Sequence, residues 1–275
     1  AKGLGHFGGP GQGYWAPGQA DLAERDPKWK LTKQYLEFYR THRQELFLHT
    51  RSLAAVAVYR DTESLAWNSL ETHRSQVNVE QALIERNVPF DLVYPAHLDD
   101  LSRYRAVVLA TAECLSGENA AKLRRFTEAG GGLLLLEDTG RYDEWRRARP
   151  KPALADIFGP DFKPGQPARA LFGSGKAAYL PKLEHVEEPS TRPEVWYVFN
   201  EFWAPPKNTA ELLDALSYVA GEPPVSLRAA DGMPIAELVA APSGATLLHV
   251  LNMDTGHPVR ALEVSVQADA TPREV

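Results

Sequence analysis

Cysteine and long apolar runs are scarce in this sequence, and both shortages exclude classes of protein. Cys114 is the only cysteine in 275 residues, so the chain can form no intramolecular disulfide and no zinc site built on paired cysteines. No apolar run approaches the ~20 residues that span a bilayer, and no charged-then-apolar leader is present. We therefore expect no membrane partner and a cytoplasmic location. The chain starts at Ala1 without a Met, so an export signal upstream would not be visible.

An excess of basic charge is also lacking. The net charge is −6 at pH 7, whereas phosphate binding needs a basic face, so nucleic acid is not an expected partner. The histidines are scattered without metal-ligand spacing, and we predict no metal and no cofactor. The glycine-rich stretch 8–13 has no strand before it and no Lys-Ser/Thr after it, which excludes dinucleotide and phosphate-loop motifs.

The most informative segment is a strand, a helix and a second strand within 104–136. Residues 104–110 form a short apolar run that predicts a buried strand. Ser116 is placed to cap a helix that the glycines at 130–132 end. Residues 133–136 predict a second buried strand, which delivers polar residues 137–139 to its carboxyl end, where ligands gather in open α/β sheets.

The same alternation extends along the chain. Strands are expected at 54–59 and 89–94, with helices at 77–85 and 209–220, which predicts an α/β fold with a mainly parallel sheet and helices on both faces. The Pro- and Gly-rich residues 150–205 remain unassigned.

The sequence patterns at both ends of the chain differ from the strand and helix alternation between them. Before the sheet, residues 1–51 hold a glycine-rich loop and a helix capped by Asp26, whose aromatic side has nothing to pack on. After the sheet, strand-like runs at 235–239, 246–252 and 261–266 predict a small C-terminal antiparallel β module. We therefore predict three domains, at residues 1–51, 52–222 and 223–275.

Cys114 follows a predicted buried strand, where an α/β nucleophile is expected. A nucleophile elbow needs small residues two positions before and after, and Ala112 and Ser116 meet that pattern only by half. A structural thiol is preferred, and a cysteine hydrolase using Cys114 is the weaker alternative.

Acidic residues cluster after the strand that ends at Leu136. Glu137, Asp138, Asp143 and Glu144 are suited to acid/base chemistry or glycoside hydrolysis. They are equally suited to local ion pairs with Arg141, Arg146 and Arg147, which stabilise little when exposed. We favour the ion pairs.

These residues carry a family resemblance. The segment 115–132, the sequence LLLLEDTG at 133–140, YDE at 142–144 and LADIFG at 154–159 together resemble the β-galactosidase trimerisation domain. This is the glutamine amidotransferase-like second domain of glycoside hydrolase family 42 and its relatives. YDE followed by LADIFG is the most specific part, and residues 52–222 are the firmest.

The resemblance implies a flavodoxin-like, class I glutamine amidotransferase-like fold without the amidotransferase triad. Where those enzymes carry their cysteine, this chain has Glu137-Asp138-Thr139. The start, with GPGQGYWAPGQADL and the aromatic helix, resembles the end of a catalytic barrel. By implication the carboxylates of a retaining glycosidase lie on barrel strands upstream of Ala1, so no catalytic residue is predicted here.

We therefore predict a non-catalytic oligomerisation or accessory region of a β-galactosidase-like glycoside hydrolase. Its expected partners are copies of itself, with a trimer among the implied states, and carbohydrate through the parent enzyme. The alternative is a standalone binding or assembly module. The loop predicted as an interface, or as the wall of a neighbour's sugar site, contains Glu137, Asp138, Arg141, Tyr142, Asp143, Glu144 and Trp145.

Overall fold

The computed structural model describes residues 27–186, 203–254 and 256–267. The chain forms two compact units. One contains residues 1–53 and 238–249, and the other contains 54–237 and 250–275. The predicted glycine-rich start and the cap Asp26 lie outside the described residues.

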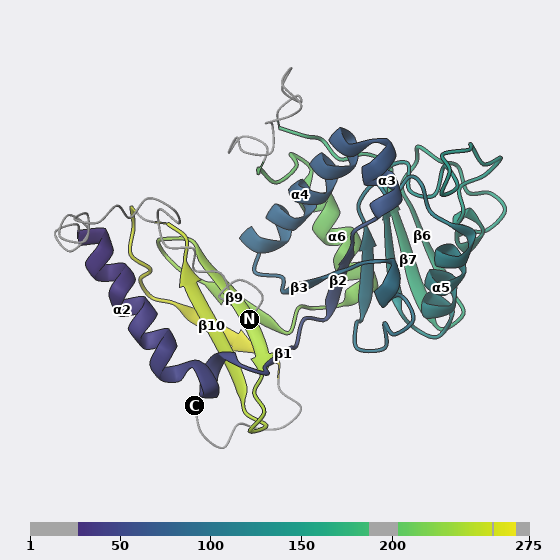
Figure 1. The fold of residues 1–275 in the computed structure, drawn as a ribbon. Helices are drawn as coiled ribbons and strands as arrows, with labels where there is room; N and C mark the ends of the chain where they lie inside the picture. The colour runs from purple at the N-terminus through teal and green to yellow at the C-terminus, as the bar shows by residue number, and fades with distance from the viewer. Residues whose placement is uncertain (1–26, 187–202, 255, 268–275) are drawn as a thin grey trace, which may run out of the picture. The chain divides into compact units, whose positions relative to one another are not determined.

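The larger unit is built on a six-stranded sheet with the order β3-β2-β4-β5-β7-β6 (Figure 1). Neighbouring strands in the first five positions run parallel, and β6 pairs antiparallel with β7 at the edge. The strands are β2 (Val56–Tyr59), β3 (Phe90–Val93), β4 (Ala106–Leu109), β5 (Gly132–Leu136), β6 (Ala168–Phe172) and β7 (Gly175–Leu180). The predicted α/β fold with a mainly parallel sheet is confirmed.

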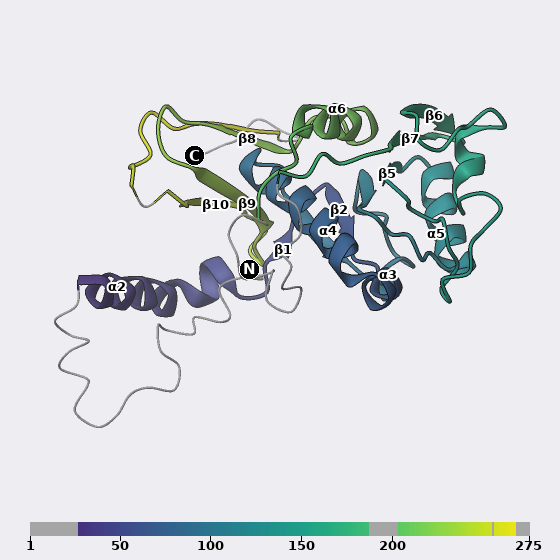
Figure 2. The same ribbon diagram turned by 90° about the horizontal axis from the view of Figure 1, so that it is seen from above.

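Helices cover both faces of this sheet (Figures 1 and 2). The α-helices of the unit are α3 (Thr62–Trp67), α4 (Ser69–Glu85), α5 (Gly117–Glu128) and α6 (Thr209–Ala220). Two short 3-10 helices join them, at Pro95–His97 and Ala155–Phe158. In α5 the predicted cap is present, because Ser116 Oγ accepts a hydrogen bond from Asn119 N at 3.1 Å.

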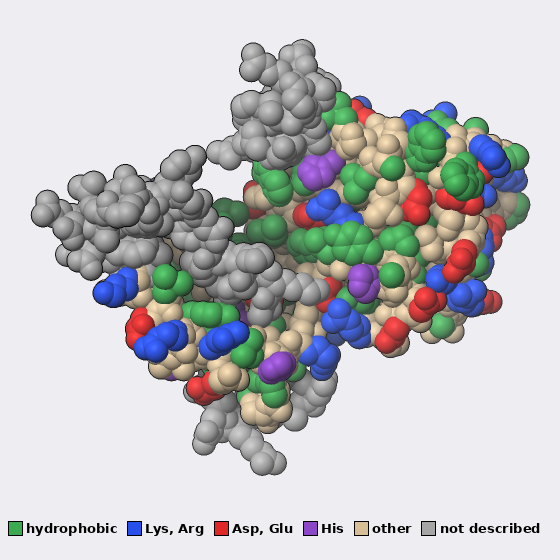
Figure 3. Space-filling view, viewed as in Figure 1, with side chains coloured by type: hydrophobic (Ala, Val, Ile, Leu, Met, Phe, Trp, Pro, Cys, Tyr) green, Lys and Arg blue, Asp and Glu red, His purple; other side chains and the backbone are tan. Residues whose placement is uncertain are grey.

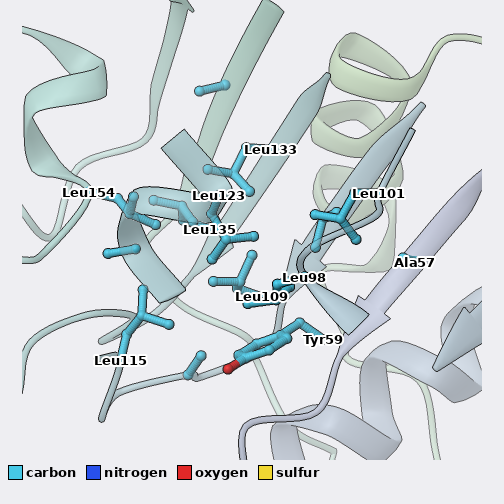
Figure 4. Close-up of a cluster of buried hydrophobic side chains, with 14 of the residues drawn as sticks. Ala57, Tyr59, Leu98, Leu101, Leu109, Leu115, Leu123, Leu133, Leu135 and Leu154 are labelled. Carbon is cyan, nitrogen blue, oxygen red and sulfur yellow. The ribbon is translucent and has the colours of Figure 1, made fainter. Parts of the chain in front are cut away.

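Side chains that alternate along β5 build two separate cores. Leu133 and Leu135 pack with Leu123 of α5 on one face, as Figure 4 shows. Leu134 and Leu136 pack with the side chains of α4 and α6 on the other face. Every residue of β5 is buried, and burying one leucine stabilises a fold by about 1.5–3 kcal/mol.

The structure differs from the sequence prediction at two places, and at both the local sequence pattern does not reveal the element. Helix α4 begins at Ser69 rather than Val77, because its first turns bury the polar residues Thr72, Ser75 and Gln76, which an apolar pattern does not reveal. Strands β6 and β7 lie in the segment left unassigned. The sequences of β6 and β7 contain only short stretches typical of a strand, and pairing with β5 decides the structure of β7.

The antiparallel strands lie in two small sheets. β8 (Val225–Arg228) pairs with β11 (Glu263–Val266). In the other sheet, β1 (Arg51–Ser52) and β10 (Thr246–Asn252) flank β9 (Pro234–Ala240). The expected antiparallel strands near the carboxyl end are therefore present.

The predicted aromatic helix is α2 (Pro27–His42), followed by a π-helical turn at Arg43–Phe47. Several of its side chains are exposed, and they include Tyr35, Leu36 and Phe38. Among the described residues, no helix combines the length and apolar character that crossing a membrane requires.

Candidate functional site

Polar residues gather at the carboxyl ends of the parallel strands, as expected for an open α/β sheet. Asp61 follows β2, Thr111 and Glu113 follow β4, and the segment Glu137–Thr139 follows β5. On the face of this unit drawn in Figure 3, acidic and basic side chains are interspersed.

Glu137 is turned into the protein. Its backbone adopts φ 53°, in the left-handed region that non-glycine residues rarely occupy. Oε2 accepts hydrogen bonds from Ser75 Oγ at 2.6 Å and from Thr111 Oγ1, and Oε1 accepts from Leu183 N at 3.2 Å. His185 Nε2 lies 3.8 Å from Oε1. The carboxylate thus ties together α4 and the ends of three strands.

The next residues run along the segment that follows β4. Gly140 N donates to Ala112 O, and Tyr142 N donates to Glu113 O, both at 2.8 Å. Tyr142 also forms isolated bridges with Cys114 and Ala148. The predicted site loop is therefore held by backbone hydrogen bonds, as a short continuation of the parallel sheet.

The tip of this loop is closed by Asp143. Its Oδ1 accepts from Trp145 N at 2.9 Å and from Arg147 N at 2.8 Å. These backbone hydrogen bonds, the bond from Arg147 first, hold the pKa of Asp143 below its usual value. The tight turn leaves the Trp145 side chain 64% exposed at the tip.

Hydrogen bonds join helix α3 to the loop tip. Trp67 Nε1 donates to Glu144 O at 3.2 Å, and Arg146 Nη1 donates to Trp67 O at 2.7 Å. Arg146 also lies over the Tyr142 ring, 5.4 Å from its centroid. Trp67 is itself half exposed, so the loop tip and the end of α3 form one surface. We call Trp67, Tyr142, Trp145 and Arg146 the loop-tip surface.

The seven predicted residues are thus not one group. Tyr142, Asp143, Glu144 and Trp145 belong to the loop tip, and the carboxylate of Glu137 points away from it. Asp138 pairs with Arg141 at 3.2 Å, and both side chains are more than half exposed. Such an ion pair contributes little to stability.

Cys114 is fully buried. Burial, followed by the nearby Glu113 and Asp61 charges, raises the pKa of its thiol to about 11. A thiolate is the reactive form, so this cysteine is a poor nucleophile near neutral pH. The preference for a structural thiol agrees with this environment.

Asp61 caps α3 by accepting from Ser64 N at 3.1 Å, and Ser64 Oγ accepts from Cys114 N at 2.8 Å. Burial raises the pKa of Asp61 to about 7. Glu113 is also buried, with Arg146 Nη2 3.5 Å from its Oε1. In the described part of the chain, no group of three His, Cys, Asp or Glu is arranged to hold a metal ion.

Sequence reasoning did not assign Ser75, Thr111, Leu183 and His185 to this region. The sequence could have pointed to Thr111, because this residue directly follows a predicted strand just as Glu137 does. Ser75 and Leu183 were not, because only the tertiary structure brings them to the carboxylate.

Comparison with known proteins finds a family model that matches part of the larger unit. Residues 54–180 match the model of the family described as the beta-galactosidase trimerisation domain. No curated protein sequence matches this chain.

Solved structures of β-galactosidases resemble the chain. The enzyme from Bacillus circulans sp. alkalophilus has a TM-score of 0.50 and 14% identity, over 82% of this chain and 43% of that one. The enzyme from Marinomonas ef1 has a TM-score of 0.47 and 15% identity, over 77% of this chain and 37% of that one. Gan42B, a GH42 enzyme from G. stearothermophilus, has a TM-score of 0.44 and 17% identity, over 78% of this chain and 40% of that one.

The chain spans less than half the length of these three enzymes. At such identities, the likeness to the first structure shows a shared fold. The family match coincides with the part of the chain that runs from β2 to β7 and contains the site loop. Residues 54–180 therefore carry the similarity to the β-galactosidase trimerisation domain family.

Proposed function

We propose that this chain is a non-catalytic accessory region of a glycoside hydrolase, and that it joins copies of the parent enzyme through its α/β unit. The observation that carries the proposal is the family match over residues 54–180, whose name describes self-association. The β-galactosidase structures that resemble the chain support the glycoside hydrolase context.

The strand order supports the finer proposal of a flavodoxin-like fold. Numbered along the chain, the five parallel strands follow the order 2-1-3-4-5 across the sheet, which is the doubly wound order of flavodoxin. Thr111 lies two residues after the third of these strands, β4, and Glu137 directly follows the fourth, β5.

The loop-tip surface is our proposed contact between copies. Exposed Trp and Tyr side chains together with Arg are the residues most enriched at the centres of protein interfaces. Trp145 and Trp67 are both at least half exposed, and the hydrogen bonds between α3 and the loop hold the Trp67 indole and the loop backbone in place before binding. Ordering costs on association are therefore small.

Light scattering tests this proposal. We expect the chain to have a molar mass above its monomer value of 30.4 kDa, and three times that value if it trimerises. The double variant Tyr142→Ala, Trp145→Ala is expected to lower the mass, whereas Trp203→Ala, which removes another exposed indole, leaves it unchanged. A monomeric native chain, or a double variant with the native mass, would contradict the loop-tip contact.

We also propose that residues 1–51 are the end of a catalytic barrel that carries the two carboxylates of a retaining glycosidase. The exposed aromatic side chains of α2 support this, because Tyr35 is 54% and Phe38 is 50% exposed. Exposed apolar groups in such a row mark a surface that another element covers.

The standalone-module alternative makes a different prediction about the gene. Sequencing the coding DNA upstream of Ala1 would reveal an open frame for a β/α barrel if the accessory proposal is correct. A start codon directly before Ala1 would favour the standalone module. The cysteine hydrolase alternative requires a reactive thiol. The burial of Cys114 instead predicts slow labelling of the native protein by a thiol reagent, and slow labelling would count against that alternative.

A further inference from the structure

A cavity of about 660 Å³ opens at the amino ends of β4, β5 and β7, at the edge of the sheet opposite to the site loop. Its walls come from the residues just before β4, from α5 and the turn that follows it, from the start of β7 and from the end of α6. Cavities near this size hold small ligands in many proteins. Its described lining shares no residue with the loop-tip surface, so a ligand here goes beyond the proposed function.

Both charged side chains in the described lining are basic. They are Arg105, directly before β4, and Lys176, the second residue of β7. Among the described residues, neither forms an ion pair with a carboxylate. Glu128 and Glu222 are next in sequence to lining residues, but both are exposed and neither lines the cavity. Because exposed charges are screened by water and salt, the cavity keeps an excess of positive charge.

Arg105 is held in place by acceptors that carry no charge. Its Nη1 donates to the backbone oxygen of Glu222 at 3.0 Å, and its Nη2 donates to Gln267 Oε1 at 3.3 Å. A guanidinium has five N–H donors, and these two bonds use two of them. The guanidinium is therefore positioned before a ligand binds, which lowers the ordering cost of binding, and its charge is not neutralised.

Lys176 is placed by an aromatic ring. Its Nζ lies 5.3 Å from the centroid of the Tyr218 ring, and such a cation–π contact leaves the positive charge of the ammonium in place. Arg169 lies over the same ring, 4.9 Å from the centroid, but it is paired with Asp214. Neither member of that pair lines the cavity, so Lys176 remains the unneutralised cation on this side chain cluster.

Two helix ends reduce the positive charge of the cavity without cancelling it. The carboxyl ends of α5 and α6 reach the lining through Ala129 and Ala220. Each helix end is equivalent to about half a negative charge. Two full positive charges and two such ends leave an excess of roughly one positive charge. A ligand with a single negative charge therefore fits this balance better than a dianion.

Another part of the wall is apolar. Phe126, Val219 and Ala220 line it. Phe126 packs on the core of one face of the sheet and Val219 belongs to the core of the other face, so both side chains are held firmly. The turn at Gly130 and Gly131 adds no side chain that would fill the cavity. A ligand with an apolar body gains free energy by covering this wall.

We propose that this cavity binds a small organic acid, whose carboxylate is bound by Arg105 and Lys176 and whose apolar body lies against Phe126. A carboxylate carries one negative charge, and its two oxygens match the fork of an arginine side chain. Ser174, which also lines the cavity, has a hydroxyl group that can donate to the same carboxylate.

Titration of the chain with phenylacetate, followed by saturation-transfer NMR and calorimetry, tests the proposal. Phenylacetamide has the same shape without the charge, and inorganic phosphate is the compact anionic probe. A ligand of this size binds with a Kd on the order of 1 mM at ordinary efficiency. We expect saturable binding of phenylacetate in that range, and at least fivefold weaker binding of the amide and of phosphate.

Two variants and a matched control locate the site. Lys176→Met removes the charge of an exposed side chain and keeps its apolar stem, and Arg105→Gln removes the guanidinium fork. Each is expected to weaken phenylacetate binding about tenfold, because each loses a charge-assisted hydrogen bond. Lys182→Met also removes an exposed lysine, but Lys182 follows the opposite end of β7, so binding stays native. Circular dichroism is expected to be unchanged in all three.

Three results would overturn the proposal. They are no saturable binding of phenylacetate up to about 100 mM, a hundred times the expected Kd, native affinity in both cavity variants, and binding of the amide or of phosphate as tight as that of phenylacetate. Light scattering of the same samples keeps this inference separate from the proposed function. An oligomer that does not bind phenylacetate contradicts the acid site alone, and a monomer that binds it contradicts the loop-tip contact alone.

Discussion

Arg146 and Trp67 are 79 positions apart in sequence, yet Arg146 Nη1 donates a 2.7 Å hydrogen bond to the backbone carbonyl oxygen of Trp67. Trp67 returns the contact through Nε1, which donates to Glu144 O. The loop after β5 and the end of α3 are therefore held by two hydrogen bonds of opposite direction.

Removing the first of these bonds should loosen the loop without unfolding the sheet. For Arg146→Ala we expect amide hydrogen exchange at 143–148 to rise about fivefold, because loss of one hydrogen bond is worth roughly 1 kcal/mol. Arg147→Ala is the matched control, since the structure shows its backbone N–H, and not its side chain, bonded to Asp143. Equal exchange in the two variants would contradict the role of Arg146.

Glu137 is expected to be a stabilising residue. Replacing it by Ala leaves two hydroxyl groups and Leu183 N without their carboxylate acceptor, so the free energy of unfolding should fall by about 3 kcal/mol. Glu137→Gly should be less harmful than Glu137→Ala by about 1 kcal/mol, because glycine adopts φ 53° without strain. Urea denaturation measures both, and a reversed order would show that backbone strain at this position is not significant.

Gly132 is required by close packing of α6 on the start of β5. A Cβ at this position would lie 2.3 Å from Val219 O, so Gly132→Ala should lower the free energy of unfolding by about 1–3 kcal/mol. Gly117→Ala is the control, because a Cβ there meets nothing within 4 Å. It should change stability by less than about 0.5 kcal/mol, and thermal melts of the two variants compare them directly.

Asp61 should make stability depend on pH. Its pKa is raised to about 7 in the folded protein, against roughly 3.9 in an unfolded chain. The folded state therefore binds more protons between these values, and the contribution of Asp61 to stability is full below about pH 4 and is lost as pH rises through 7.

The difference between the native chain and Asp61→Asn isolates this effect from other titrating groups. Asparagine keeps an acceptor for Ser64 N but does not titrate. Stability of the native chain relative to the variant should decline from pH 5 to pH 8, by at most about 1.4 kcal/mol per pH unit. A constant difference over this range would show that Asp61 is ionised at a normal pKa in the folded state.

The predictable parts of this protein are those in which local sequence and burial agree. The apolar residues of β5 indicated a strand buried on both faces, and the structure places Leu133 and Leu134 in two different cores. Ser116 indicated the start of α5, since a cap acts within one helical turn. For the site, the rule that polar residues follow the ends of parallel strands correctly predicted that Glu137 and Asp138 lie at the carboxyl end of β5.

Other features depended on contacts between distant residues. Strand β7 forms where it pairs with β5, and the early turns of α4 bury polar groups that no apolar pattern reveals. The left-handed backbone of Glu137 directs its carboxylate to Ser75 and Thr111, while Asp138, one residue later, lies at the rim of a cavity.

The sequence by itself thus determined the first four parallel strands, the helices α5 and α6, and which polar residues reach the edge of the sheet, because hydrophobic periodicity and capping are local. Only the tertiary structure decided the strand order, the partners of Glu137, the contact of Trp67 with the loop tip and the cavity beside Phe126. Each of these is a pairing of residues far apart in the chain, and its energy exists only after the sheet has brought them together.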